Sequence, residues 1–297
     1  MAVAARAALA AGFTVRRLSH AGGAEIAGLD LARPLGSDAV AALRRALRDH
    51  QFLVFHDQEL APQAQVAFTR MWGEPEANDY NAVLAHPEHP EMLVLTNKKN
   101  EHGVPSESRH IGRMWHQDGC FWPNPAMGVM LYCRAIPALG GDTMFANQVQ
   151  AYAALSPTYR QMLEGLKARH SFAMIWRTSS RKPLTPEEMA KTAASEHPVV
   201  RTHPETGQKA LFVNPFMTEG IAGMTAAESA TILEYIYAHA TQPAFTHRHR
   251  WRVGDLVLWD NRCLMHLAVK DFDVENPDAP ANIRLMHRTA IKGDRPF

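Results

Sequence analysis

The feature that most constrains the fold is a short polar motif, Trp115-His116-Gln117-Asp118, which precedes the apolar run Met127–Cys133. Side chains two residues apart on an extended chain point the same way, so His116 and Asp118 are expected to share a face. An imidazole and a carboxylate at this spacing can occupy neighbouring positions on one metal ion. The chain holds 16 histidines, so the motif alone is weak evidence for a metal, and a His and an Asp that hydrogen-bond to their neighbours explain it until a further ligand is found. A metal site therefore requires a third ligand from elsewhere in the chain.

A third ligand is available near the C-terminus, in a predicted pair of strands. Leu256–Trp259 is a short apolar strand that follows a Gly-Asp turn signal. The chain then passes through the polar residues 260–262 and returns as a second apolar strand, Cys263–Val269, which carries His266. Two histidines and one carboxylate form a facial triad, which leaves three positions open on Fe(II).

Two arginines follow in another predicted strand, Asn282–Ile291. On a strand, Arg284, Met286 and Arg288 face one way, so the two guanidiniums are expected to lie side by side. They repel each other unless an anion lies between them, and a guanidinium suits a carboxylate or a sulfonate. Pairing of each arginine with a surface Asp or Glu explains the same pattern. The stretch indicates either an anion site or ordinary surface ion pairs.

Taken together, these motifs resemble the TauD/TfdA family of taurine and 2,4-dichlorophenoxyacetate dioxygenases, which depend on Fe(II) and 2-oxoglutarate. The resemblance runs from about Phe13 to Phe297, with the motifs in the family's order. The motifs are His116-x-Asp118, Gly140-Gly-Asp-Thr143, His197–Gly207 with Leu211–Asn214, Trp259-Asp-Asn-Arg262, His266 and Arg284-x-x-x-Arg288.

The resemblance implies a role for five of these residues. His116, Asp118 and His266 would bind Fe(II), and Thr143 and Arg284 would hold the distal carboxylate of 2-oxoglutarate. Dioxygen is the remaining cosubstrate, and 2-oxoglutarate would leave as succinate and CO2 while a substrate C–H bond is hydroxylated. Related halogenases lack the carboxylate ligand, so its presence here argues against halogenation. The two histidines of the block 197–207 each precede a proline and are assigned to turns, not to the metal.

Other functions stay open at this stage. Desaturation and oxidative decarboxylation occur on the same scaffold in this family. A non-catalytic sensor of a metal or an anion would use the same residues. A Zn-dependent hydrolase would use the same three ligands, but it lacks an evident general base and leaves the arginine pair unexplained.

Arg288 is expected to anchor the anionic group of a small-molecule substrate. In the taurine enzymes of the family, a histidine shortly after a Gly-Glu pair helps to bind the sulfonate. Counting from the corresponding pair, residues 73–74, leads here to Asn78, with Tyr80 close by. This departure disfavours taurine as the substrate. We expect Asn78, Tyr80 and Phe216 to contact the substrate.

Two irregular stretches are predicted to border the site. Residues 74–113 are expected to form a substrate wall. The family resemblance implies that residues 171–196 form a lid that excludes water, although a solvated charged loop explains this second stretch as well. Arg284 lies 18 residues after His266, a longer gap than in the taurine enzymes. The turn-rich Asp273–Pro280 is expected to loop out, so that both arginines still reach the site.

Many short strands and few helices predict a mainly β fold, in which two antiparallel sheets face each other with helices on the flank. The resemblance implies the same architecture, a double-stranded β-helix or jelly roll. We expect one domain over residues 1–297, with residues 1–12 as a frayed terminus. A helix is expected to begin at Ser37 as its cap, and others at Pro62, at Ser156-Pro157 and at Thr225.

Composition excludes several classes of partner. Lys and Arg total 31 against 30 for Asp and Glu, a balance that gives no support for attraction to nucleic acid or membrane. No apolar stretch approaches the roughly 18 residues that span a bilayer. Three cysteines suit a reducing compartment better than a disulfide framework, so we expect a cytoplasmic protein. The resemblance implies a homo-oligomer, either a dimer or a tetramer.

Overall fold

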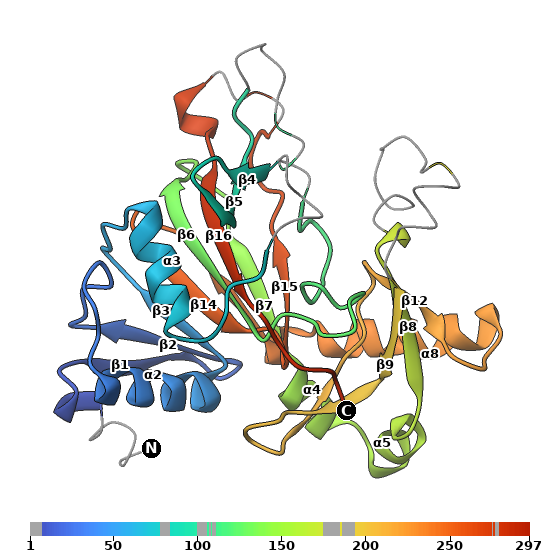
Figure 1. The fold of residues 1–297 in the computed structure, drawn as a ribbon. Coiled ribbons are helices and arrows are strands. Elements are labelled where there is room, and N and C mark those ends of the chain that lie inside the picture. Colours follow the sequence, from blue (N-terminus) through green and yellow to red (C-terminus); the bar gives the residue numbers. More distant parts are fainter. Residues whose placement is uncertain are drawn as a thin grey trace.

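The computed structural model describes residues 8–77, 84–99, 106, 108, 111–174, 185, 194–274, 276 and 279–297. Within them, a large β-sheet faces a smaller one, and helices lie against the outside (Figure 1). The prediction of a mainly β fold with flanking helices is confirmed.

The large sheet contains, among the described residues, eight strands in the order β1-β2-β3-β14-β6-β16-β5-β4. Neighbouring strands are antiparallel except β2 and β3, which are parallel. The strands are β1 (Thr14–Ser19), β2 (Gly22–Ala27), β3 (Phe52–Phe55), β4 (Ala85–His86), β5 (His89–Thr96), β6 (Gly128–Ala135), β14 (Leu256–Asp260) and β16 (Leu285–Ile291).

Three smaller sheets complete the β-structure of the described residues. They have the orders β13-β7-β15, β12-β8-β9 and β10-β11, and the first of them faces the large sheet. The strands are β7 (Thr143–Asn147), β8 (Lys167–Ser171), β9 (Ala194–Pro198), β10 (Val200–Thr202), β11 (Lys209–Leu211), β12 (Thr218–Ile221), β13 (Thr246–His249) and β15 (Leu264–Ala268).

Alternation along β14 explains why the central strands are apolar throughout. Leu256 and Leu258 pack outward in the cluster that includes α2 (Ser37–His50). Val257 and Trp259 pack inward, in a second cluster that includes Phe145 of the opposite sheet. Both faces of the strand are therefore buried, and the chain can present polar groups only where the strand ends.

The helices lie outside the sheets and mostly begin where their capping residues predict. Thr225 forms a complete capping box with Glu228, and the Ser156 side chain accepts a hydrogen bond from the backbone N–H of Tyr159. The predicted cap at Ser37 is wrong: Gly36 is the N-cap, and Ser37 is already helical. Besides α2, the helices are α3 (Pro62–Arg70), α4 (Gln148–Ala154), α5 (Pro157–Leu163), α8 (Ala226–Ala240), η3 (Pro243–Phe245) and η4 (Pro280–Asn282).

Several predicted features fall partly or wholly outside the described residues. These are the N-terminal residues 1–7, the substrate candidates Asn78 and Tyr80, and most of the predicted lid, namely residues 175–184 and 186–193. Parts of the predicted substrate wall (78–83, 100–105, 107 and 109–110) and of the predicted loop 273–280 (275 and 277–278) also lie outside them. Among the residues that are described, none of the helices has the length and apolar character that a bilayer span requires.

Candidate metal centre

His116 and His266 lie opposite each other on adjacent segments of the chain. The backbone N–H of His116 donates to the carbonyl of His266 at 3.0 Å, and the N–H of His266 donates to the carbonyl of His116 at 2.9 Å. Residues that pair in this way point to the same side of the ladder. The two imidazole centroids are accordingly 4.0 Å apart. Local pairing thus places side by side two histidines that are far apart in the sequence.

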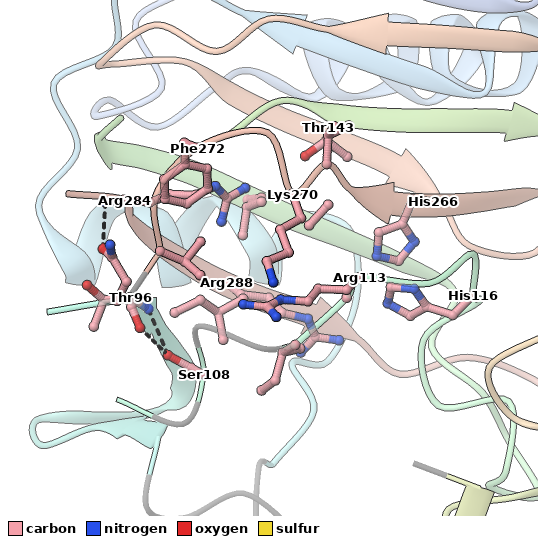
Figure 2. Close-up of a pocket in the computed structure, with 18 of the residues that line it drawn as sticks. Thr96, Ser108, Arg113, His116, Thr143, His266, Lys270, Phe272, Arg284 and Arg288 are labelled. Carbon is pink, nitrogen blue, oxygen red and sulfur yellow. Dashed lines mark hydrogen bonds between the residues drawn. The ribbon is translucent and has the colours of Figure 1, made fainter. Parts of the chain in front are cut away.

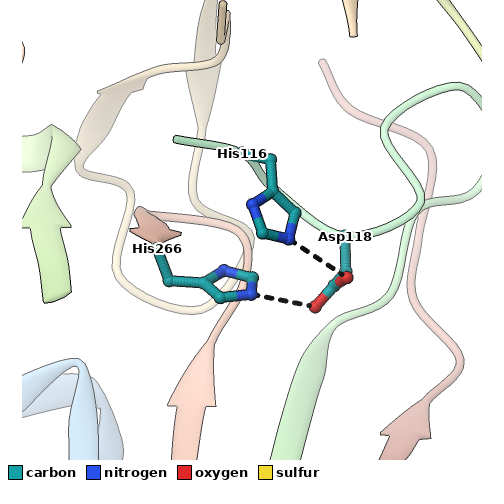
Figure 3. A group of neighbouring side chains, drawn as sticks. All are labelled: His116, Asp118 and His266. Atoms are coloured by element: carbon teal, nitrogen blue, oxygen red, sulfur yellow. Dashed lines mark ion pairs between the residues drawn. The ribbon is translucent and has the colours of Figure 1, made fainter. Parts of the chain in front are cut away.

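Asp118 completes the cluster (Figure 3). Its Oδ1 lies 3.8 Å from Nε2 of His116, and its Oδ2 lies 3.5 Å from Nε2 of His266. Gln117, between His116 and Asp118 in the sequence, is fully buried, and its Oε1 accepts a hydrogen bond from Nδ2 of Asn214. The predicted sharing of a face by His116 and Asp118 is confirmed, but the motif is no regular strand, because His116 forms an isolated bridge and Asp118 enters a turn.

Both imidazoles are suited to act as neutral ligands. Nδ1 of His116 lies 2.8 Å from the carbonyl of Met114. A carbonyl can only accept, so Nδ1 carries a proton, which leaves Nε2 as the nitrogen that faces Asp118 and that a metal would use. Burial, reinforced by the neighbouring His116, lowers the pKa of His266 to about 3, which leaves its imidazole neutral near pH 7.

The carboxylate of Asp118 is suited to a cation. Burial on its own raises the pKa of Asp118, but the guanidinium of Arg288 and the two imidazoles outweigh burial and hold the pKa at about 2. Oδ2 of Asp118 is buried and has no hydrogen-bond partner among the described residues. A buried anionic oxygen of this kind is costly unless it is paired. A divalent metal between the carboxylate and the two imidazoles would satisfy it, so this donor set fits such an ion.

A second group of potential ligands, His203, Asp260 and Cys263, is less suited to a metal. Nδ1 of His203 accepts the backbone N–H groups of residues 205 and 206, both at 3.2 Å. Its Nε2 must therefore carry the proton, which it donates to Oδ2 of Asp260 at 2.9 Å. Burial raises the pKa of the Cys263 thiol well above its ordinary value. The lone pairs that a metal needs are already in use, so we interpret this group as a structural network.

A cavity opens beside the three clustered side chains (Figure 2). It encloses about 810 Å³, including its opening to solvent. His116, Asp118 and His266 line one end, and Arg284 lines the wall together with Thr143. Apolar side chains from β5, β6 and the segment after β15 form much of the remaining surface. Residues that could bind a metal and cationic residues therefore line the same cavity.

Arg284 donates two hydrogen bonds that hold it in the cavity wall. Its backbone N–H donates to Oδ1 of Asn97 at 2.9 Å, and its Nε donates to the carbonyl of Gly141 at 3.1 Å. Gly141 has φ of 75°, and a Cβ there would lie 3.0 Å from Ile136 and 3.4 Å from Cδ of Arg284. Burial lowers the pKa of Arg284 to about 10, so it still carries its charge near pH 7. Its terminal amino groups remain available for an anion, since the described residues offer them no hydrogen bond.

Thr143 begins β7 and contributes a hydroxyl to the same cavity. Its Oγ1 accepts a hydrogen bond from Nε1 of Trp251 at 2.9 Å. The indole N–H can only donate, so the hydroxyl proton of Thr143 stays available for another acceptor. The long connection from His266 to Arg284 leaves both of those residues in the wall of the cavity that Thr143 lines.

Arg288 and Phe216 lie next to the metal-type ligands. A terminal nitrogen of Arg288 is 3.4 Å from Oδ1 of Asp118, and the ring of Phe216 meets that of His116 edge-on, with centroids 5.7 Å apart. Two further cations that sequence reasoning missed, Lys270 and Arg113, line the cavity, and Figure 2 shows them pointing toward the same part of it as Arg288. The available signal was spacing, because residues 266, 268 and 270 alternate onto one face.

Two imidazoles and one carboxylate beside open space are the donor set of non-haem Fe(II) oxygenases. Comparison with known proteins agrees with this class. The model of the family described as "Taurine catabolism dioxygenase TauD, TfdA family" matches residues 14–290. The chain belongs to this family, and it is a non-haem enzyme that depends on Fe(II), 2-oxoglutarate (also called alpha-ketoglutarate) and O2.

Two characterised relatives illustrate the similarity. The chain is 33% identical over 252 residues to the alpha-ketoglutarate-dependent 2,4-dichlorophenoxyacetate dioxygenase of Cupriavidus pinatubonensis, covering 80% of this chain and 85% of the relative. It is 30% identical over 284 residues to the alpha-ketoglutarate-dependent sulfate ester dioxygenase of Pseudomonas putida, covering 92% and 87%.

A solved structure extends the similarity to the fold. The chain superposes on AAD-2 in complex with Mn(II) and N-oxalylglycine with a TM-score of 0.80 and 30% identity, covering 96% of this chain and 98% of that one. The predicted jelly-roll architecture is therefore confirmed.

Proposed function

We propose that the enzyme hydroxylates a C–H bond of a small anionic substrate, with Fe(II) held by His116, Asp118 and His266. The observation that carries the proposal is the convergence of these three side chains in a cavity that also contains Arg284 and Arg288. When bound, Fe(II) and 2-oxoglutarate supply the oxidising chemistry, in which O2 is consumed and 2-oxoglutarate is converted to succinate and CO2.

Arg284 and Thr143 would bind the distal carboxylate of 2-oxoglutarate. The terminal amino groups of Arg284 can donate two charge-assisted hydrogen bonds, because its Nε already bonds to Gly141. The Thr143 hydroxyl can donate a third, because Trp251 occupies an acceptor position on its oxygen. These residues orient the cosubstrate, and its 2-oxo acid end would then point toward the metal ligands.

Arg288 would bind the anionic group of the substrate, with Lys270 and Arg113 as additional cations at the same end of the cavity. The relatives named above act on a phenoxyacetate and on a sulfate ester. By analogy, we propose a carboxylate, sulfonate or sulfate as the recognised group. Phe216, with Asn78 and Tyr80, would contact the rest of the molecule.

A succinate-release screen tests this proposal. Purified enzyme with Fe(II), ascorbate and 2-oxoglutarate would be incubated with aryloxyacetates, alkyl sulfates, small sulfonates and amino acids, and products identified by mass. We expect stimulation by at least one anionic class and a product that gains one oxygen atom. Arg288→Met should abolish the stimulation but retain slow uncoupled turnover. Loss of two hydrogens or of CO2 from the substrate would instead indicate desaturation or decarboxylation.

The alternative of a non-catalytic metal or anion sensor predicts no succinate with any substrate, not even from 2-oxoglutarate turnover uncoupled from substrate oxidation.

We also propose a cytoplasmic homo-oligomer, a dimer or a tetramer. The three cysteines are free and buried, which agrees with a reducing compartment. Analytical ultracentrifugation tests the oligomeric state directly.

A further inference from the structure

We propose that Asn261 is a positioning residue for the metal centre, because its side-chain amide holds the peptide groups on both sides of Asp118. This inference rests on the proposed role of Asp118 as a metal ligand. Asn261 itself lies in the turn between β14 and β15, and its side chain does not reach the cavity. Its effect on the metal would therefore be transmitted through Asp118.

Three hydrogen bonds connect Asn261 to the segment that carries Asp118. The backbone N–H of Asp118 donates to Oδ1 of Asn261 at 2.8 Å. Nδ2 of Asn261 donates to the carbonyl of Asp118 at 2.8 Å and to the carbonyl of Ala126 at 3.0 Å. The residue is fully buried, and both of its N–H donors are used.

The Asn261 amide makes the two backbone hydrogen bonds to Asp118 that a neighbouring strand would otherwise make. His116 is held by reciprocal backbone bonds with His266, whereas Asp118 has already entered a turn. The amide of Asn261 accepts from and donates to the backbone of Asp118, as the opposite residue of a ladder does. His116 and Asp118 are thus both aligned against one continuous segment, in which the turn that carries Asn261 connects β14 of the large sheet to β15 of the facing sheet, and β15 carries His266.

The turn that carries Asn261 is itself held firmly. Oδ1 of Asp260 accepts from Nε of Arg262 at 2.9 Å, Oδ2 accepts from a terminal nitrogen of Arg262 at 2.7 Å, and His203 donates to the same Oδ2. The backbone N–H of Asn261 also donates to the carbonyl of Met127 at 3.0 Å. A satisfied buried network of this kind rigidifies its surroundings. The His203–Asp260–Arg262 network, which does not fit a metal, therefore supports the residue that aligns Asp118.

Loss of this alignment should weaken metal binding. Without the amide, the carboxylate of Asp118 is no longer held at one position relative to the two imidazoles. Loss of a partner that orients a metal ligand typically weakens metal affinity by roughly 10–100-fold.

The test compares Asn261→Leu and Asn261→Asp with wild type. Leucine keeps the approximate volume and loses all three bonds, whereas aspartate keeps the acceptor for the Asp118 N–H and loses both donors. Mn(II) affinity would be measured by calorimetry, and the visible spectrum of Co(II) would report coordination. We expect Mn(II) binding weaker by roughly 10–100-fold, with a larger loss for leucine, and an altered Co(II) spectrum at saturation.

Asn147→Leu is the matched control. Asn147 is also buried and also makes three hydrogen bonds to backbone groups, at Ala21, Val149 and Gln150. The last two cap α4, and none of the three holds a proposed metal ligand. The Asn147→Leu variant should lower the unfolding temperature about as much as Asn261→Leu does, and it should leave the Mn(II) affinity and the Co(II) spectrum unchanged.

Wild-type Mn(II) affinity in both Asn261 variants, beside weak binding in His116→Ala, would overturn the role of Asn261 and leave the metal site intact. Equal binding by wild type and His116→Ala would overturn the metal site, and the role of Asn261 with it. Loss of the folded state in both Asn261 variants would assign the residue to stability and also overturn the proposal.

Discussion

Replacing Arg284 with methionine should weaken 2-oxoglutarate binding by roughly 100-fold while leaving the metal affinity unchanged. In the structure, Nε of Arg284 is committed to the carbonyl of Gly141, so two terminal amino groups remain for the distal carboxylate. A hydrogen bond to a charged group contributes about 1.5–3 kcal/mol, so two of them contribute at least about 3 kcal/mol. Since about 1.4 kcal/mol corresponds to tenfold in affinity, this loss corresponds to roughly 100-fold.

The substitution should not unfold the protein. Burial lowers the pKa of Arg284 to about 10, so the charge is held at some cost, and a methionine of similar length removes that cost. The folded state should therefore be as stable as wild type, or slightly more stable, when no cosubstrate is present.

The assay is calorimetric titration of the Mn(II)-loaded protein with 2-oxoglutarate and with N-oxalylglycine, followed by the KM for 2-oxoglutarate in succinate release. Arg134→Met is a suitable control, since Arg134 lies on the neighbouring β6 with its guanidinium 5.9 Å from the ring of Tyr132 and outside the cavity lining. An Arg284→Met affinity within about threefold of wild type, a difference of less than 1 kcal/mol, would refute the assignment. So would an equal fall in metal affinity.

Three further predictions concern Thr143 in the cavity and two carboxyl groups outside its lining, those of Asp260 and Glu76. Thr143→Val should raise the KM for 2-oxoglutarate about tenfold through loss of one hydrogen bond to a carboxylate, and an unchanged KM would contradict its role. Arg262→Met should lower the free energy of unfolding at pH 7 by about 3–5 kcal/mol in urea titrations, because it leaves Asp260 buried without its cation. Burial on its own raises the pKa of Asp260, but Arg262 outweighs burial and holds the pKa low. The Asp260–Arg262 pair therefore stabilises the fold above the unfolded pKa of about 3.9, and the stability difference between wild type and Arg262→Met should shrink below about pH 4. Burial raises the pKa of Glu76 from 4.5 to about 7, so the metal-free folded protein loses stability as the pH rises through this interval. Glu76→Gln should therefore raise the unfolding temperature more at pH 8 than at pH 5. Equal increases at the two pH values would contradict this prediction.

The candidate ligands could be predicted from the sequence because their chemistry is local. His116 and Asp118 lie two residues apart, so any extended backbone turns them the same way, and only a third ligand had to be found. His266 follows a short apolar strand and a polar connection, a pattern that predicts a second strand, and the structure places this strand in the facing sheet. The apolar strands were found for the same reason, since burial on both faces requires continuous apolar runs.

Features that depend on tertiary contacts could not be predicted in this way. The proton on Nδ1 of His116 is set by a carbonyl in the folded chain, and the partners of Asn261 lie more than one hundred residues away in the sequence. The cap at Ser37 was mispredicted because glycine and serine are both acceptable at an N-cap and here they are adjacent. Lys270 and Arg113 were missed because a charged residue near a strand end usually faces solvent. The spacing from His266 was a signal for Lys270, whereas only the folded cavity distinguishes Arg113 from a solvent-facing residue.

A crystal structure with Mn(II) and N-oxalylglycine tests the central claim most directly, with anomalous scattering to locate the metal. We expect one Mn(II) ion per chain, bound by Nε2 of His116, Nε2 of His266 and a carboxylate oxygen of Asp118, with the distal carboxylate of N-oxalylglycine on Arg284 and Thr143. An ion at His203, Asp260 and Cys263, or one that lacks any of the three proposed ligands, would contradict the account.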